Sequence, residues 1–344
     1  MVWHPSRSVT VLAVIVVPVA LFGALLFVGL RSMRSQSGPR IHAGPALTSA
    51  DIDRMMTELS NWGRWGKDDQ LGAVNLITPA KRKEATALVR EGVSVSLSIN
   101  PPTEKAIDNP NPFELTMAPP KPGAFIAQDT WRVSHHGFAF THLDALCHWI
   151  HQGKLYNGFD AAGITSRGCA KGGMEVLKDG VLTRGILIDI PRLKGVPYLE
   201  PGTPITRGEI EMWEAKAGVR MSAGDVVLVR TGRWARRAAL GPHSIQTTSA
   251  GVHVSAVPLF RARDIAMIGS DAGLDVTPSG VHGVGNPVHT ILIVGMGVTI
   301  IDNADLERLA ETAARLNRWE FLFSAAPIPV TGATGSLINA VATF

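Results

Sequence analysis

The sequence predicts one α/β domain preceded by a single transmembrane helix. Short apolar runs of the buried-strand type alternate with capped helices along most of the chain. An uncharged run of 22 residues, Val9–Leu30, precedes them. No linker after Arg40 is long enough to divide the rest. We therefore expect a membrane anchor with its juxtamembrane segment in residues 1–40 and one domain in residues 41–344.

Capping residues and periodicity place the first elements of that domain. Residues 48–60 have their apolar side chains on one helical face. Thr78 and Pro79 are a typical N-cap and first helical residue, and Gly92 is a typical stop. Residues 93–99, VSVSLSI, alternate with period two, as a half-buried strand does.

Further along, three apolar runs indicate buried strands, and two helices complete the pattern. Thr206 and Glu209 form a capping box for a helix that ends near Gly218. Seven prolines between residues 101 and 122 indicate an extended loop or flap. The strands are GILIDI (185–190), DVVLVR (225–230) and IAMIGS (265–270), and the last helix covers about residues 304–317.

The uncharged run is long enough to cross a bilayer. As a helix, residues 9–30 would measure roughly 33 Å, and a bilayer core needs about 20 such residues. A cleavable signal peptide is the alternative, but its apolar region is usually shorter and followed by a small-residue cleavage site. We therefore predict a membrane localisation through a single-pass anchor. Three arginines follow the span and one precedes it, an asymmetry too small to decide the side of the domain.

Charge argues against a nucleic-acid partner. The chain has 33 Lys and Arg against 29 Asp and Glu, a formal net charge of +4. Residues 1–40 contain four arginines and no acidic residue, so the rest of the chain is neutral. A neutral domain lacks the positive field that attracts phosphate groups, and we expect no nucleic acid.

The two cysteines carry no recognisable motif. Cys147 and Cys169 lie 22 residues apart, which fits neither a zinc ribbon nor a CxxC pair. We interpret them as two reduced, buried thiols.

Histidines cluster in the middle of the chain and indicate a metal site. Five lie within 17 residues, around the stretch THLDALCH at 141–148. On a strand, His142 and Asp144 point to the same face, and an imidazole with a carboxylate suits Zn²⁺ or Mn²⁺. His148 follows four residues later, where a neutral histidine could transfer a proton. A G-x-S-x-G nucleophile motif is absent from the sequence.

The chain resembles the metal-dependent cyclase family, which includes bacterial kynurenine formamidase and isatin hydrolase. The stretch THLDALCH with KLYNG (154–158) is similar to the family signature H-x-G-T-H-x-D-x-x-x-H. Three further blocks resemble the longer members, so the likeness covers about residues 55–344. They are NWGRWGKDDQLGAVNLITP (61–79), VGMGVTIIDNADLERLA (294–310) and APIPVTGATGSLIN (326–339).

The resemblance implies a set of site residues. His142 and Asp144 match metal ligands, and His148 matches the catalytic histidine. His289 and Asp302 best match the histidine and the acid that complete the family's metal site, with His282 as the alternative to His289. Asp302 stands where the family has Glu, one methylene shorter, which bears on a second metal ion.

One position departs from the family pattern. Phe138 stands where the family has its first histidine, and His136 is the nearest substitute. In an extended chain, His136 and His142 would lie roughly 20 Å apart. His136 can therefore be a ligand only if the segment loops, which Gly137 permits; otherwise it supports the site or contacts substrate.

Three residues are candidates for substrate binding: Trp65, Phe138 and Asp271. Trp65 could form the wall of an aromatic pocket or serve as a packing anchor. Asp271 follows an apolar strand, where it could face a ligand crevice or cap the next turn.

The function expected from the resemblance is metal-dependent hydrolysis of a C–N amide bond in a small carbonyl compound. The implied fold is a swivelling β/β/α domain, the implied substrate is of the N-formylkynurenine type, and the implied pathway is tryptophan catabolism to kynurenine. The family also implies a homo-oligomer with Zn or Mn as cofactor. A catalytically inactive metal-binding or scaffold protein of the same fold is the alternative, and a cysteine enzyme using Cys147 is a third possibility.

Overall fold

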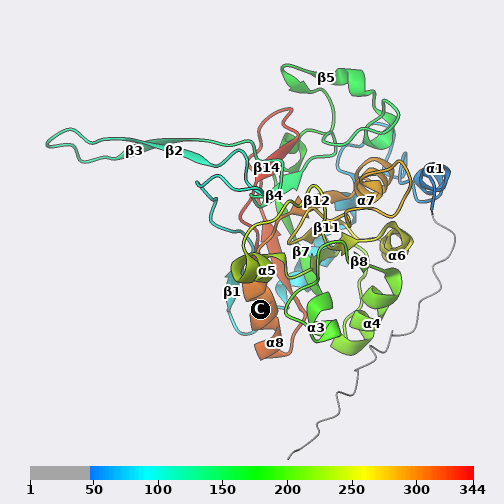
Figure 1. Cartoon of the computed structure of the whole chain (residues 1–344). Helices are drawn as coiled ribbons and strands as arrows, with labels where there is room; N and C mark the ends of the chain where they lie inside the picture. Colours follow the sequence, from blue (N-terminus) through cyan, green and yellow to red (C-terminus); the bar gives the residue numbers. More distant parts are fainter. Residues whose placement is uncertain (1–46) are drawn as a thin grey trace, which may run out of the picture. The chain divides into compact units, whose positions relative to one another are not determined.

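A nine-stranded mixed sheet forms the centre of residues 47–344, the part of the chain that the computed structural model describes (Figure 1). The strand order is β1-β15-β13-β7-β9-β11-β12-β4-β14. The bounds are β1 Ser94–Ser96, β4 His142–Asp144, β7 Val181–Asp189, β9 Val226–Arg230, β11 Met267–Ser270, β12 Thr299–Asp302, β13 Glu320–Ala325, β14 Gly335–Leu337 and β15 Val341–Thr343.

Four parallel strands, β7, β9, β11 and β12, make the middle of the sheet, and antiparallel strands flank them on both sides. Every residue of β9, β11 and β12 is buried. A strand that is buried on both faces has a continuous apolar sequence. The apolar runs at 185–190, 225–230 and 265–270 therefore predicted β7, β9 and β11 correctly.

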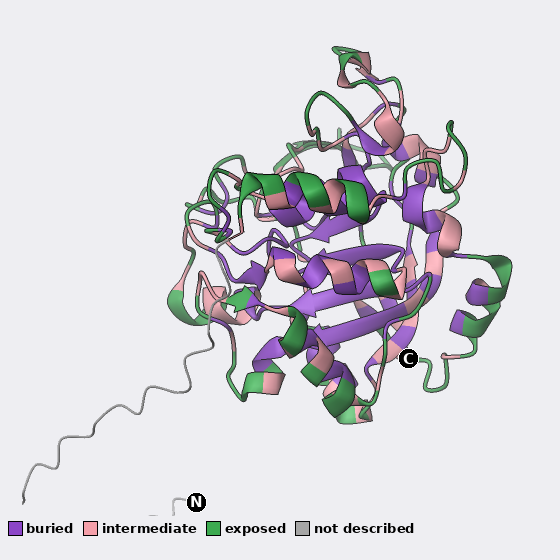
Figure 2. Cartoon of the chain, turned by 90° about the vertical axis from the view of Figure 1, so that its right-hand side faces the viewer, coloured by how far each residue is buried: buried purple, intermediate pink, exposed green. Residues whose placement is uncertain are grey.

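Helices cover the sheet, and their exposed sides face outward (Figure 2). The helix α2 packs against β7 and β13, and α3 and α4 pack beside β9 and β7. Thr78 caps α2, and Thr206 with Glu209 forms the expected capping box of α4. The bounds are α1 Ser49–Glu58, α2 Pro79–Thr86, α3 Ile190–Lys194, α4 Arg207–Ala217, α5 Arg233–Leu240, α6 Val257–Arg263, α7 Pro287–His289 and α8 Glu307–Leu316.

Three two-stranded sheets lie outside the central sheet. They pair β8 (Pro204–Ile205) with β10 (Gly251–Val252), β5 (Ile164–Thr165) with β6 (Gly168–Cys169), and β2 (Glu114–Ala118) with β3 (Gln128–Arg132). The last pair is a long hairpin that reaches away from the central sheet (Figure 1). The proline-rich segment therefore contains a strand, where the sequence predicts only a loop or flap.

The predicted fold class is wrong in two respects. The strand that carries His142 and Asp144, β4, pairs with β12 on one side and β14 on the other in one mixed sheet, so the domain is not the swivelling β/β/α type. The second error is the transmembrane helix: within residues 47–344, no helix is long and apolar enough to cross a bilayer. The longest helix there, α4, has 11 residues, and a bilayer core needs about 20.

The predicted membrane localisation is wrong for the same reason. It depended on residues 9–30, which lie outside the described residues, and nothing in residues 47–344 replaces them as a membrane segment.

The interpretation of the two cysteines as free thiols is also wrong. Cys147 and Cys169 form a disulfide bond, with their Cα atoms 6.5 Å apart. The backbone N–H of Cys147 donates to the carbonyl of Gly172, which brings the two segments together. The bond leaves no thiolate at Cys147 for the cysteine-enzyme alternative.

Candidate metal centre

Two neighbouring strands place three polar side chains on one face of the sheet. His142 and Asp144 lie two residues apart on β4, so both point to the same side. Asp302, the last residue of β12, pairs directly with His142 across the antiparallel ladder, which puts its side chain on that side too. All three are buried. Strand parity, readable in the sequence, brings His142 and Asp144 together, and the pairing of β4 with β12 adds Asp302.

His136 reaches the same point through a loop. Gly137 has a φ of 135°, a backbone conformation that favours glycine, and the segment bends between it and β4. Asn303 holds this bend, because its side-chain amide donates to the carbonyls of Gly137 (2.7 Å) and Phe140 (3.1 Å). The His136 Nδ1 atom consequently lies 3.1 Å from Asp144 Oδ1.

Buried Arg233 supports this bend from the other side. Its guanidinium donates to the side chain of Asn303 (2.6 Å) and to the carbonyl of Phe138. Asp271 in turn accepts from the backbone N–H groups of Thr231, Gly232 and Arg233 at the start of α5. These contacts connect the α5 N-terminus to the loop that carries His136.

His289 enters from the opposite side, on α7. The helix α7 passes directly into a π-helical stretch, Thr290–Met296, and such irregular turns are frequent at functional sites. The Nδ1 atom of His289 lies 2.5 Å from Asp275 Oδ2, and its Nε2 atom lies 3.6 Å from Asp302 Oδ2 and 3.9 Å from Asp144 Oδ2. Asp275 thus orients the ring so that Nε2 faces the two other carboxylates.

The polar atoms form two overlapping groups that share Asp144. One group contains His136, His142 and Asp144, and the other contains Asp144, His289 and Asp302. Within each group the candidate ligand atoms lie within 4.8 Å of one another. Three histidines each have one ring nitrogen held by the protein, His136 by Thr334, His142 by the Phe140 carbonyl and His289 by Asp275. The other nitrogen of each ring points toward Asp144.

The charges in this cluster perturb one another. Burial alone would raise the pKa of Asp144, but the nearby rings of His136, His142 and His148 hold it well below its usual value. Burial would lower the pKa of His289, yet Asp275 and Asp302 raise it well above its usual value. The carboxylates therefore favour a positive charge at the centre of the cluster.

Several buried polar atoms of the cluster lack a hydrogen-bond partner, and this supports a metal ion at the site. Among the described residues, both carboxylate oxygens of Asp144, Asp302 Oδ1 and His136 Nδ1 are buried without a hydrogen-bond partner. Burying such atoms unpaired is costly, and a divalent cation would satisfy them. The donor set of imidazole and carboxylate suits Zn²⁺ and Mn²⁺.

His148 lies beside this cluster rather than within either group. Its ring stacks on His136 with centroids 3.7 Å apart, and its Nε2 atom is 3.9 Å from Asp144 Oδ1. The side chain is 23% exposed, more than the 2% of His142. Burial lowers the pKa of His148 to about 4, so the ring is neutral at pH 7 and can accept a proton.

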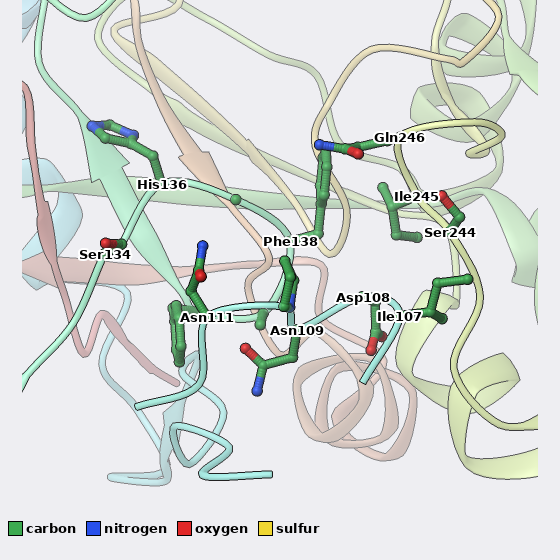
Figure 3. A pocket seen from close by; sticks show the side chains of 14 residues that line it. Ile107, Asp108, Asn109, Asn111, Ser134, His136, Phe138, Ser244, Ile245 and Gln246 are labelled. Atoms are coloured by element: carbon green, nitrogen blue, oxygen red, sulfur yellow. The ribbon is translucent and has the colours of Figure 1, made fainter. Parts of the chain in front are cut away.

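A cavity of about 160 Å³ adjoins the cluster at His136 (Figure 3). Phe138 lies on its wall with Ile107 and Ile245, and the polar side chains of Asn109, Asn111, Ser134, Ser244 and Gln246 complete it. Asn109 Oδ1 is buried and has no hydrogen-bond partner. The structure therefore places Phe138 where a bound molecule could touch it.

Trp65 and Asp271, the other candidates for substrate binding, lie elsewhere. Trp65 packs against the core, with the guanidinium of Arg64 4.9 Å from its ring centroid, and it is not among the residues that line the cavity beside His136. Asp271 is 0% exposed. Its oxygens accept hydrogen bonds from the α5 backbone and from Thr231.

Sequence reasoning missed several neighbours of the site. Asp275 was not singled out, although it lies in the same DAGLD stretch as Asp271. Trp149 follows His148 directly, and its ring centroid lies 4.9 Å from that of His289. Arg233 and Asn303 hold the loop of His136 from 70 residues apart in the chain. Of Arg233 and Asn303, only Asn303 could have been noticed in the sequence, because it lies next to Asp302 in the stretch DNAD (302–305).

The fold and the site define an α/β protein whose mixed sheet carries a histidine and aspartate cluster compatible with a metal ion. Residues 77–275 match the Cyclase family, and the chain belongs to that family. A crystal structure of a novel cyclase is 33% identical, with a TM-score of 0.74, over 84% of this chain and 99% of that one. The family resemblance seen in the sequence is confirmed.

More distant solved structures share the fold. An isatin hydrolase bound to the product analogue thioisatinate is 21% identical, with a TM-score of 0.54, over 76% of this chain and 94% of that one. Isatin hydrolase A from Labrenzia aggregata, bound to benzyl benzoate, is 20% identical, with a TM-score of 0.53, over 75% and 94%. No curated protein matches the chain in a comparison of sequences.

Proposed function

We propose that this protein is a metal-dependent hydrolase that cleaves the C–N bond of an amide in a small carbonyl compound. The observation that supports this most is the arrangement of three histidines around Asp144, each with one ring nitrogen held by the protein and the other directed inward. Such anchoring is typical of histidines that bind metal. The solved isatin hydrolases share the fold, and their name states a hydrolytic activity.

His136, His142, Asp144, His289 and Asp302 would hold the ion, which is Zn²⁺ or Mn²⁺ in this proposal. A divalent cation in that position polarises a carbonyl group and acidifies water. Asp275 and the Phe140 carbonyl keep the ring nitrogens of His289 and His142 directed at it.

His148 is the proposed proton carrier. Its neutral ring takes a proton from the attacking water at Nε2 and returns it to the leaving nitrogen, so the amine departs uncharged. Its stacking on His136 keeps it beside the carboxylate of Asp144 without making it a ligand. Removing such a group typically slows a reaction by about 10²–10⁴-fold.

The cavity supports an aryl substrate. Its volume of about 160 Å³ is close to the ~150 Å³ that holds one benzene ring in a protein interior. Phe138 and Ile107 offer apolar surface, and Asn111, Ser134 and Gln246 offer polar groups for an amide. We therefore propose an arylformamidase-like activity on an N-formylkynurenine-type substrate, which would place the protein in tryptophan catabolism to kynurenine.

The test compares wild type with His148→Ala. Purified protein is loaded with Zn²⁺ or Mn²⁺, its metal content is measured, and release of the aryl amine from N-formyl anilides is followed. We expect His148→Ala to keep its metal and to lose at least about 10²-fold in kcat. His151→Ala is the matched control, because His151 bonds Asp53 at the surface.

Three outcomes of this experiment would contradict parts of the proposal. Full turnover in His148→Ala would refute the role of His148. A wild-type protein that binds metal but cleaves no amide would favour the alternative of an inactive metal-binding or scaffold protein. A wild-type protein that binds no metal would refute the metal centre itself.

A further inference from the structure

A second cavity, of about 350 Å³, adjoins the cavity at His136. Pro110, Asn111 and Ser134 belong to the walls of both, and Asn111 and Ser134 are labelled in Figure 3. We call the cavity at His136 the inner cavity and the second one the outer cavity. Because the two share part of their walls, a molecule bound in the inner cavity can extend into the outer one.

Charged side chains line the outer cavity. Lys105 and Arg132 each bring a positive charge and Glu114 brings a negative one, which leaves the wall a net charge of +1. Glu114 and Arg132 face each other in the register of β2 and β3, yet within residues 47–344 neither forms an ion pair within 4.0 Å. Lys105 forms none there either. The cations of the outer cavity are therefore available to a bound molecule.

The inner cavity differs in its charge. Asp108 is the acidic residue in its wall, and the guanidinium groups of Arg237 (2.7 Å) and Arg233 (3.4 Å) already pair with it. Apart from His136, the other side chains of that wall are apolar or uncharged polar groups. The inner cavity therefore suits an uncharged aryl amide, and a charged part of the same molecule would lie in the outer cavity.

The segment that carries Lys105 is held in a fixed conformation. The side-chain amide of Asn109 donates to the carbonyls of Pro102 (3.2 Å) and Glu104 (2.7 Å). The backbone of Asn109 exchanges two hydrogen bonds with Ala106, each of 3.0 Å. Asn109 is itself buried. This wall of the outer cavity therefore exists before a ligand arrives, which reduces the entropy cost of binding.

We propose that the outer cavity is a subsite for a carboxylate, and that the substrate is an aryl amide with a carboxylate on its side chain. This inference rests on the proposed function, because it assigns the far end of the same substrate. The guanidinium of Arg132 can hold both carboxylate oxygens, and the ammonium of Lys105 adds a second charge-assisted hydrogen bond.

The distance between the two ends of the site fits a short substrate. Arg132 lies four residues before His136, so their Cα atoms are at most about 14 Å apart. The Arg132 side chain covers part of that distance. A substrate whose carboxylate is a few carbon atoms away from its aryl ring can therefore reach both cavities.

Glu114 limits the charge that the subsite accepts. A wall with a net charge of +1 matches a single carboxylate. A phosphate group carries about −1.5 to −2 charges at pH 7, and the Glu114 carboxylate would repel the excess. The outer cavity therefore favours a monoanion.

Isothermal titration calorimetry of the metal-loaded, full-length protein with two aryl ketones tests the proposal. One ketone, ortho-aminobenzoylpropionate, has a carboxylate on its side chain, and ortho-aminoacetophenone is the matched compound without it. We expect wild type to bind the carboxylate compound at least about tenfold more tightly. Arg132→Gln and Lys105→Gln should each raise its Kd by about tenfold, because each removes a charge-assisted hydrogen bond, and should leave the Kd of ortho-aminoacetophenone unchanged.

Lys121→Gln is the control variant. It removes a positive charge from the turn of the same hairpin, outside both cavities, and should change neither Kd. Equal binding of the two ketones to wild type, or no binding of either, would overturn the proposal. Retained preference for the carboxylate compound in Arg132→Gln and Lys105→Gln would also overturn it. An equal loss in Lys121→Gln would do so too, because overall charge would then explain the preference.

Turnover of the N-formyl derivatives of both ketones separates this proposal from the proposed function. If wild type cleaves both derivatives with equal kcat/KM, the subsite is refuted and the hydrolase activity stands. If wild type cleaves neither but binds the carboxylate compound through Arg132, the hydrolase activity is refuted and the subsite stands. We expect a higher kcat/KM for the derivative with the carboxylate, and a loss of that advantage in Arg132→Gln through KM rather than kcat.

Discussion

Asp275 offers the sharpest test of how the metal centre is built. The carboxylate is buried and accepts from the backbone N–H groups of Val288 (2.8 Å) and His289 (3.1 Å) as well as from His289 Nδ1 (2.5 Å). Asp275→Asn keeps the size of the side chain and one carbonyl oxygen. It removes the negative charge and offers an N–H₂ group that can face His289 Nδ1, so the ring would shift its proton to Nε2, the atom that must bind metal.

The size of the effect follows from the role of that hydrogen bond. Removing the partner of a metal-binding histidine typically costs about 10–100-fold in metal affinity. At about 1.4 kcal/mol per tenfold, this corresponds to roughly 1.4–2.8 kcal/mol of binding free energy. The backbone N–H of Val288, which bonds the other carboxylate oxygen, can still bond the amide oxygen, so we expect the helix start to survive the loss of the His289 N–H bond.

Competition between the protein and a chelator of known affinity measures the Kd for Zn²⁺ in wild type and in the variant. Asp225→Asn is the control, because Asp225 is equally buried but pairs with Lys81 and Arg184 at the start of β9. We expect it to lower stability without changing the Kd. An unchanged Kd in Asp275→Asn, or an equal rise in both variants, would refute the argument.

Two further predictions concern stability. Burial opposes the ionisation of Asp108, but Arg237 and Arg233 lower its pKa below the ordinary 3.8. Asp108→Asn should therefore cost about 3 kcal/mol at pH 7, and this difference from wild type should narrow as the pH falls below about 4, where Asp108 gains a proton, as measured by urea unfolding. Gly72 has a φ of 60°, and a Cβ atom there would lie 2.1 Å from the Gly297 carbonyl oxygen. Gly72→Ala should cost about 3 kcal/mol, whereas Gly63→Ala, with a similar φ but open space, should cost about 1–2 kcal/mol; equal losses would contradict the clash.

Local patterns in the sequence predict three of the four parallel strands in the middle of the sheet and four of the helices. The apolar runs at 185–190, 225–230 and 265–270 become β7, β9 and β11, because strands buried on both faces must be apolar throughout. The hairpin of β2 and β3 was missed, since its prolines at residues 119, 120 and 122 lie in the turn between the two strands and not within them. Proline interrupts a strand ladder but not a connecting turn.

The disulfide and the transmembrane helix show where local patterns misled. Two cysteines 22 residues apart carry no motif, and their pairing depends on the loop of β5 and β6 returning to the segment after β4. The hydropathy of residues 9–30 predicted a membrane helix, but residues 47–344 contain none that could span a bilayer. The prediction rested on apolar composition alone.

The sequence by itself determined the parts of the site that depend on strand parity and on the family pattern. His142 and Asp144 share a face because they are two residues apart on a strand, and the family resemblance pointed to His148, His289 and Asp302. These inferences need only the alternation of side chains along the backbone or a motif, both of which are local in the chain.

Only the tertiary structure decided how the remaining groups meet. Whether His136 could reach Asp144 depended on the bend that Asn303 and Arg233 hold, and both come from distant segments. Asp275 orients His289, whereas Asp271 accepts hydrogen bonds from the α5 backbone. The two aspartates lie only four residues apart in the chain and are both buried. Long-range packing sets these contacts, because a hydrogen bond depends on the distance between atoms in space and not on their separation along the chain.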